Sequence, residues 1–140
     1  MTTEENKALI RNVFAKNDAA QNMDALREAA DASYVAHFPG MPPADRDGMA
    51  AVGGSFYAGF PGMTHTLHEL VAEGDVVAVR LTVSGKHTAP FVTPMGELPP
   101  SGREMSLEVL NLFHLAGSKV KEQWIQFDMM SFMQQVAPSA

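Results

Sequence analysis

The sequence predicts one α+β domain, in which three N-terminal helices pack inside a curved, mostly antiparallel sheet around an internal pocket. Two patterns predict this. Apolar residues recur at helical spacing before residue 60, and they alternate with polar residues after Met63. The length of 140 residues corresponds to one domain and allows both a core and a pocket to be buried. We therefore interpret residues 1–140 as a single unit.

Three segments are predicted to be helical. The first begins at Thr3, ahead of two glutamates that suit the first turn of a helix. A short second helix is predicted over residues 23–32, and a brief extended segment follows over residues 34–38. The third helix is predicted over residues 45–60, and a Pro-Gly pair follows it.

The remainder of the chain is predicted to form long strands. Residues 63–71 and 76–87 form the first hairpin in this prediction, because turn residues separate two alternating segments. A third strand is predicted over residues 104–115 and a last strand over residues 120–128. Residues 129–136 then form a helical tail.

Asp128 is a lone carboxylate in the apolar segment at the end of the last strand. Burial without a partner raises the pKa of a carboxylic acid by up to roughly 3–5 units. Such an acid can take up and return a proton near neutral pH, so Asp128 is the candidate catalytic acid/base. The alternative is an exposed N-cap of the helix that follows, and the sequence leaves both open.

Strand alternation also predicts which polar side chains face the pocket. If Leu67 points inward, His65 shares its face, and Thr66 and His68 lie on the opposite face. Asn111 is in line with the apolar positions of its strand. Because a buried amide needs partners, Asn111 either binds backbone groups or meets a ligand.

The sequence does not determine which face of the last strand points inward. Trp124, Gln126 and Asp128 share one face, while Ile125 and Phe127 compete for the interior. Two further histidines, at strand ends, are expected near the mouth of the pocket. The predicted substrate-binding residues are His37, His65, His87, Asn111, Trp124 and Gln126.

Composition argues against several function classes. The net charge of −6 and the lack of a Lys/Arg cluster argue against nucleic-acid binding, and the absence of cysteine excludes thiolate chemistry. His65 and His68 fall on opposite strand faces without a further ligand, so no metal is expected. The N-terminal segment has no apolar signal core and no apolar run is long enough to span a membrane. We therefore expect a cytoplasmic protein without a membrane partner.

Several motifs follow one another in a specific order and spacing. They are Tyr34-x-x-His37, the run over residues 60–91, Leu98-Pro-Pro-Ser-Gly-Arg103, and Glu122-x-Trp124 with Asp128 and Gln134-Gln135. Together they resemble the SnoaL-like polyketide cyclase family of the nuclear-transport-factor-2-like (NTF2-like) superfamily. The resemblance extends over roughly residues 8–136.

The resemblance implies a cone-shaped α+β barrel and a cofactor-free activity. The best-known enzymes of this family close a ring of aromatic polyketide methyl esters by intramolecular aldol condensation. By resemblance, Asp128 would be the acid/base, and His37, His87 and Trp124 would line or flank the cavity. We expect a homodimeric enzyme that acts on a small hydrophobic carbonyl compound.

Other functions remain open. They are a non-catalytic small-molecule-binding protein with the same pocket, a family member that acts in polyketide hydroxylation, and a scaffold whose outer sheet face serves dimerisation.

Overall fold

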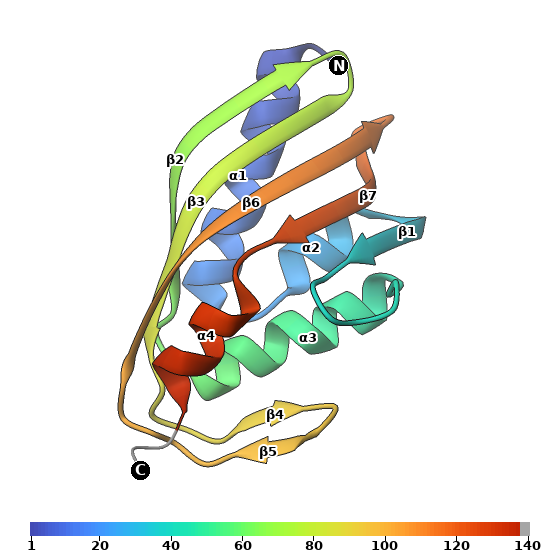
Figure 1. The fold of residues 1–140 in the computed structure, drawn as a ribbon. Coiled ribbons are helices and arrows are strands. Elements are labelled where there is room, and N and C mark those ends of the chain that lie inside the picture. Colours follow the sequence, from blue (N-terminus) through green and yellow to red (C-terminus); the bar gives the residue numbers. More distant parts are fainter. Residues whose placement is uncertain (138–140) are drawn as a thin grey trace.

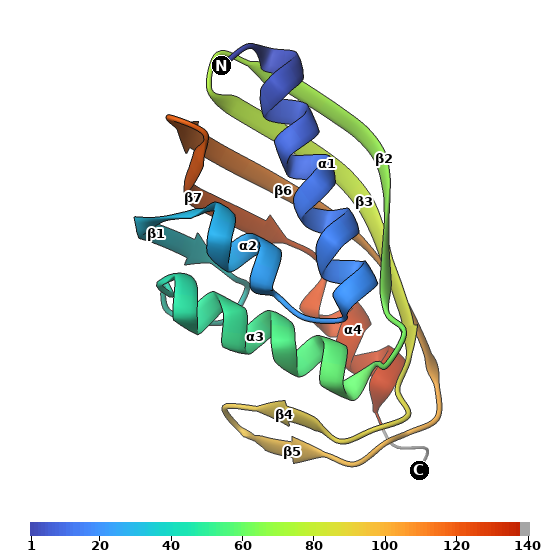
Figure 2. The ribbon, with the colours of Figure 1, turned by 180° about the vertical axis from the view of Figure 1, so that it is seen from behind.

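The structure, a computed structural model that describes residues 1–137, has one curved five-stranded sheet with three helices on one face (Figures 1 and 2). In spatial order the strands are β1 (Ala30–His37), β7 (Lys119–Gln126), β6 (Glu104–Ala116), β3 (Val76–Lys86) and β2 (Thr64–Glu73). β1 and β7 run parallel, and the other neighbouring strands are antiparallel. The predicted α+β architecture with a mostly antiparallel sheet is confirmed.

The helices are α1 (Thr3–Ala20), α2 (Asp24–Ala29), α3 (Arg46–Gly59) and α4 (Met129–Val136). A capping box begins α1: the Thr2 hydroxyl accepts from the Glu5 amide, and the Glu5 carboxylate accepts from the Thr2 amide. Figure 2 shows α1, α2 and α3 in front of the sheet, whereas α4 lies at one end of it and packs against β6.

The boundary between α2 and β1 differs from the prediction. α2 ends at Ala29, and β1 begins at Ala30, within the segment 23–32 that was expected to be helical. The alanines there favour a helix, but pairing with β7 buries Ala30, Tyr34 and Ala36. This tertiary burial outweighs local helix propensity, which is a weak preference.

Gln21 joins the end of α1 to the turn before β2. Its side-chain amide donates to the carbonyls of Asp18 (2.8 Å) and Met63 (2.9 Å), and its oxygen accepts from the Gly62 amide (2.8 Å). Gln21 itself has a left-handed backbone (φ 56°), which ends the helix. These bonds place the last turn of α1 directly beside the start of β2.

A bulge interrupts β2 between Leu67 and Glu69, after the segment that contains His65. His65 pairs with Val83 and Leu67 with Leu81, and the register then shifts before Glu69. Upstream of the bulge the predicted alternation holds, because His65 and Leu67 are partly buried while Thr66 and His68 are exposed.

A small hairpin of β4 (Phe91–Thr93) and β5 (Gly96–Leu98) lies beside α3, and β4 packs against this helix (Figure 1). A Cβ atom at Gly59 would lie 3.0 Å from the Cβ of Phe91, so the close contact between helix and hairpin depends on this glycine. Within residues 1–137, no helix is long and apolar enough to cross a membrane.

Candidate functional site

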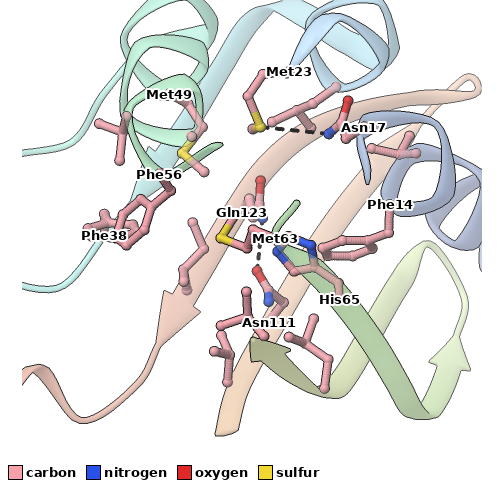
Figure 3. A pocket seen from close by; sticks show the side chains of 18 of the residues that line it. Phe14, Asn17, Met23, Phe38, Met49, Phe56, Met63, His65, Asn111 and Gln123 are labelled. Atoms are coloured by element: carbon pink, nitrogen blue, oxygen red, sulfur yellow. Dashed lines mark hydrogen bonds between the residues drawn. The ribbon is translucent and has the colours of Figure 1, made fainter. Parts of the chain in front are cut away.

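A cavity of about 110 Å³ lies between the concave face of the sheet and helices α1–α3. Its wall is mostly apolar and includes the flexible side chains of Met23, Met49 and Met63 (Figure 3). Three polar side chains from the sheet also line it: His65 of β2, Asn111 of β6 and Gln123 of β7. The cavity therefore combines an apolar wall with a few polar groups, as is typical of small-molecule sites.

His65 is held by Asp18 from the last turn of α1. The ring Nδ1 of His65 lies 2.8 Å from Asp18 Oδ1, and the backbone amide of His65 donates to Asp18 Oδ2 at 2.7 Å. The Tyr57 hydroxyl donates to Asp18 Oδ1 at 2.6 Å. Both side chains of the pair are largely buried, with 17% and 15% of their surface exposed for His65 and Asp18.

The hydrogen bonds keep Asp18 ionised. Burial opposes the charge on this carboxylate, but the bonds from the His65 ring, the Tyr57 hydroxyl and the His65 backbone outweigh it and lower the pKa of Asp18. Burial, together with the bond to Asp18, raises the pKa of the Tyr57 hydroxyl, which therefore remains a proton donor.

The Asp18 carboxylate also sets the tautomer of His65. An ionised carboxylate only accepts hydrogen bonds, so Nδ1 carries a proton and donates it to Asp18. In the neutral ring, Nε2 then keeps a free lone pair. Nε2 has no hydrogen-bond partner in the described chain, and it is not fully enclosed by protein atoms. Because His65 lines the cavity, this nitrogen is a candidate proton acceptor for a molecule bound there.

Asn111 ends a chain of three buried polar side chains. The Tyr34 hydroxyl donates to Gln123 Oε1 at 2.5 Å, and Gln123 Nε2 donates to Asn111 Oδ1 at 2.8 Å. Figure 3 shows the second of these bonds, with Asn111 and Gln123 facing one another at the cavity wall. The prediction that Asn111 faces the interior is confirmed by its 6% exposure and its place in the wall.

From Gln123 on, the odd-numbered residues of the last strand point inward, so the face shared by Trp124, Gln126 and Asp128 points away from the cavity. Gln123 and Ile125 are buried and line the cavity, whereas Gln126 is exposed and Trp124 lies on the outer face. The expectation that Trp124 and Gln126 line the pocket is therefore wrong. The inward face carries both Ile125 and Phe127, and this arrangement leaves Gln126 and Asp128 exposed to water.

Asp128 is an exposed N-cap, so the expectation of a buried acid in the pocket is wrong. It follows β7, and its carboxylate accepts from the Ser131 amide at 3.1 Å as the cap of α4. It is not among the residues that line the cavity. The physical reason for assigning it catalysis, desolvation in an apolar pocket, is missing.

Two predicted histidines lie away from the cavity. His37 stacks on Trp124 with ring centroids 5.0 Å apart and binds Glu122 at 2.6 Å, on the outer side of the sheet. His87 is fully buried, stacks on Phe60 and binds Ser101, but it is not part of the cavity wall. Of the predicted binding residues, His65 and Asn111 are the ones that line this cavity.

Sequence reasoning missed Asp18, Tyr57, Tyr34 and Gln123. One signal was present for Asp18, which lies one helical turn after Phe14 and so shares the inward face of α1. The other three required knowledge of which elements meet in the fold. Residues 1–137 contain no group of three or more His, Asp or Glu side chains arranged to hold a metal.

Solved structures of similar fold come from several bacteria. A protein from Jannaschia sp. CCS1, described as a candidate SnoaL-like polyketide cyclase, is 22% identical with a TM-score of 0.84, over 98% of this chain and 95% of that one. AclR from Streptomyces galilaeus, described as a candidate hydroxylase, is 21% identical with a TM-score of 0.82, over 95% and 96%. These likenesses show the fold, which is the predicted NTF2-like cone.

IdmH from Streptomyces antibioticus, described as a candidate polyketide cyclase, is 28% identical with a TM-score of 0.75, over 93% of this chain and 96% of that one. Among curated proteins, none matches the sequence significantly. The family model for SnoaL-like polyketide cyclases matches residues 8–136, nearly the whole chain. The protein therefore belongs to the SnoaL-like polyketide cyclase family.

Proposed function

We propose that the protein catalyses cofactor-free acid–base chemistry on a small apolar carbonyl compound bound in the cavity, with His65 as the acid/base. The observation that carries this proposal is the His65–Asp18 pair in the wall of an apolar cavity. Asp18 holds the ring with Nδ1 protonated, so that Nε2 can accept a proton from the ligand. Asp18 acts through His65 and is a positioning residue.

The chemistry is proton abstraction next to a carbonyl group. His65 Nε2 takes the proton from the α-carbon, and the electron pair of that C–H bond moves to the carbonyl oxygen as an enolate. The positive charge that develops on the ring is stabilised by the ionised Asp18 carboxylate. The Asn111 amide offers a hydrogen bond to the enolate oxygen at the same cavity wall.

Ring closure follows when the ligand carries a second carbonyl group. The enolate carbon attacks that second carbonyl carbon, a C–C bond forms, and the resulting alkoxide takes the proton back from His65. One group therefore serves as base and then as acid, and the proton balance is zero. Membership of the cyclase family supports this aldol step, and the Asp128 position does not.

The cavity volume restricts the ligand. An apolar cavity of roughly 150 Å³ is known to hold benzene, so a cavity of about 110 Å³ suits a short chain as it stands. A six-membered ring or a larger ligand requires rearrangement of the wall. Met23, Met49 and Met63 allow such a rearrangement, because unbranched thioether side chains repack at low cost.

The test needs no identified substrate. We would measure the exchange of α-protons for deuterium by NMR in small ketones such as cyclohexanone and acetophenone, with and without the protein. Wild type should accelerate the exchange, and His65→Gln should lose about 10²–10⁴-fold of that acceleration. His68→Gln is the matched control, since His68 lies three residues away on the exposed face of β2.

The outcomes separate an enzyme from a binding protein. The proposal is contradicted if His65→Gln and His68→Gln lose the same share of the exchange acceleration, or if His65→Gln keeps all of it. Ketone binding without any acceleration by wild type favours the non-catalytic binding protein.

A further inference from the structure

We infer that Tyr34, acting through Gln123, fixes which end of the Asn111 amide faces the cavity. As a result, the cavity selects ligands that place a hydrogen-bond acceptor, such as a ketone oxygen, at this wall. The inference deepens the proposed function, on which it rests only in that the ligand occupies the same cavity. Tyr34 is a positioning residue in this account.

The hydrogen bond from Tyr34 can have only one direction. Tyr34 is 1% exposed, and burial raises the pKa of its hydroxyl, so the group remains protonated and must donate its proton. Its one side-chain partner in the described structure is Gln123 Oε1 at 2.5 Å. An unsatisfied buried hydroxyl would cost about 1–3 kcal/mol.

The hydrogen bond from Tyr34 orients the Gln123 amide, which in turn orients the Asn111 amide. Since Gln123 uses its oxygen for Tyr34, its amide nitrogen donates to Asn111 Oδ1 at 2.8 Å. Asn111 therefore turns its NH₂ group away from Gln123. If both amides were reversed, Asn111 would present its oxygen to the cavity, and the Tyr34 proton would have no acceptor among residues 1–137.

The NH₂ group of Asn111 has no protein partner in residues 1–137. It is also not among the fully buried unpartnered atoms, and Asn111 lines the cavity, so we place this NH₂ group at the cavity wall. The wall around it is apolar, with Val109 and Phe113 on the same strand face. In such surroundings an N–H donor without an acceptor is costly, and a ligand carbonyl oxygen removes that cost.

The three residues come from adjacent strands, β1, β7 and β6. Each buries polar atoms in a place where apolar side chains would need no partners. Without the Tyr34 hydroxyl, the hydrogen bond between Gln123 and Asn111 could form with either amide as the donor. The two hydrogen bonds from Tyr34 to Gln123 and from Gln123 to Asn111 therefore determine whether Asn111 presents a donor or an acceptor to the cavity.

The experiment compares two ligands of one shape. Cyclohexanone and methylenecyclohexane differ by a carbonyl oxygen in place of a CH₂ group, and their dissociation constants are measured by NMR titration. The ratio of the two constants is compared between variants, because this cancels their different hydrophobicity. Asn111→Leu and Tyr34→Phe should each shift the ratio against the ketone by about three- to tenfold.

His68→Gln is the control. It alters a side chain on the exposed face of β2 that is not part of the cavity wall and that bonds to Thr82 rather than to Gln123. Its ratio should equal that of wild type. Infrared spectra of ¹³C-carbonyl cyclohexanone supply a second measurement, because a hydrogen bond from Asn111 lowers the C=O stretching frequency. Asn111→Leu should abolish this lowering, and Tyr34→Phe should reduce it.

Each outcome decides the inference. An unchanged ratio and C=O frequency in Tyr34→Phe, with both changed in Asn111→Leu, would show that Tyr34 does not position the amide. No change in Asn111→Leu would show that Asn111 does not bind the oxygen. If Tyr34→Phe does not fold, Gln123→Met replaces it with the same expected shifts. The proposed function fails if His65→Gln keeps full α-proton exchange, whereas this inference fails if the ratio is unchanged in Asn111→Leu or Tyr34→Phe, so the two failures are read from different measurements.

Discussion

Asp18 accepts three hydrogen bonds, two at Oδ1 and one at Oδ2, and all three donors are fixed by the fold. Asp18→Asn replaces one acceptor by an NH₂ group, which then faces either the His65 backbone N–H or the pair of side-chain donors. We expect the free energy of unfolding to fall by about 1–3 kcal/mol, measured by urea denaturation.

The control for this change is Asp47→Asn, which alters an exposed carboxylate paired with Arg27. A surface pair contributes about 0–1 kcal/mol, so the control should be nearly neutral. Equal stability of the two variants would mean that the three bonds to Asp18 do not stabilise the fold.

Asp128 is expected to act as a helix cap and nothing more. Asp128→Asn keeps the capping ability and should leave both stability and α-proton exchange unchanged, whereas Asp128→Ala should cost about 1 kcal/mol of unfolding free energy. A loss of 100-fold or more in exchange for Asp128→Asn would restore the catalytic role that the family resemblance implied.

The alternation of β2 predicted the inward direction of His65 because the bulge lies downstream of it. Alternation did not predict the direction of Trp124 and Gln126, since both faces of the last strand carry large apolar residues. Asp18 could not be paired with His65 from the sequence, because 47 residues separate them and the docking of α1 on β2 is a tertiary event. Strand phase is thus predictable where one face is clearly apolar, and partners across elements are not.

At the scale of elements, His87 closes the base of the β4–β5 hairpin. Its Nδ1 accepts from the Ser101 amide at 3.2 Å, and its backbone bonds to Arg103 and Gly102. Burial lowers the pKa of His87 below its ordinary value of 6.5, so the ring is neutral in the folded protein at neutral pH. The unfolded chain takes up this proton at a higher pH than the folded protein does, so stability falls as the pH decreases through about 6.5.

Urea denaturation at pH 7.5 and pH 5.5 tests this effect. Wild type should be less stable at pH 5.5, and His87→Gln should lose part of that pH dependence, while the exposed His68→Gln should keep it. Identical pH dependence in wild type and His87→Gln would contradict the account of His87.

The order of elements could be predicted from the sequence, because the change from helical to strand periodicity near Met63 is clear. The start of β1 could not. Its pairing is parallel to β7, some 90 residues later, and that contact overrides a local alanine-rich helix signal. Long-range pairing of this kind leaves no trace in a local window.

At the scale of the whole molecule, we expect a homodimer formed through the outer face of the sheet. Val71 (62% exposed) and Leu110 (56% exposed) lie on this face beside a shallow hollow that includes Leu112 and Trp124. Exposed apolar patches of this kind mark interaction surfaces. Leu110→Lys should yield monomers in light scattering after size-exclusion chromatography.

Val92→Lys is the control, because Val92 is similarly exposed (58%) but belongs to the β4–β5 hairpin. It should leave the dimer intact. A monomeric wild type would rule out this interface.

The most direct test of the account is the tautomer of His65, measured by long-range ¹H–¹⁵N NMR on protein with ¹⁵N-labelled histidine at neutral pH. The account predicts a proton on Nδ1, bound to Asp18, and a bare Nε2 whose signal shifts when cyclohexanone is added, while the signals of His68 do not move. A proton on Nε2 with Nδ1 bare, or an Nε2 signal that ignores the ketone, would contradict it.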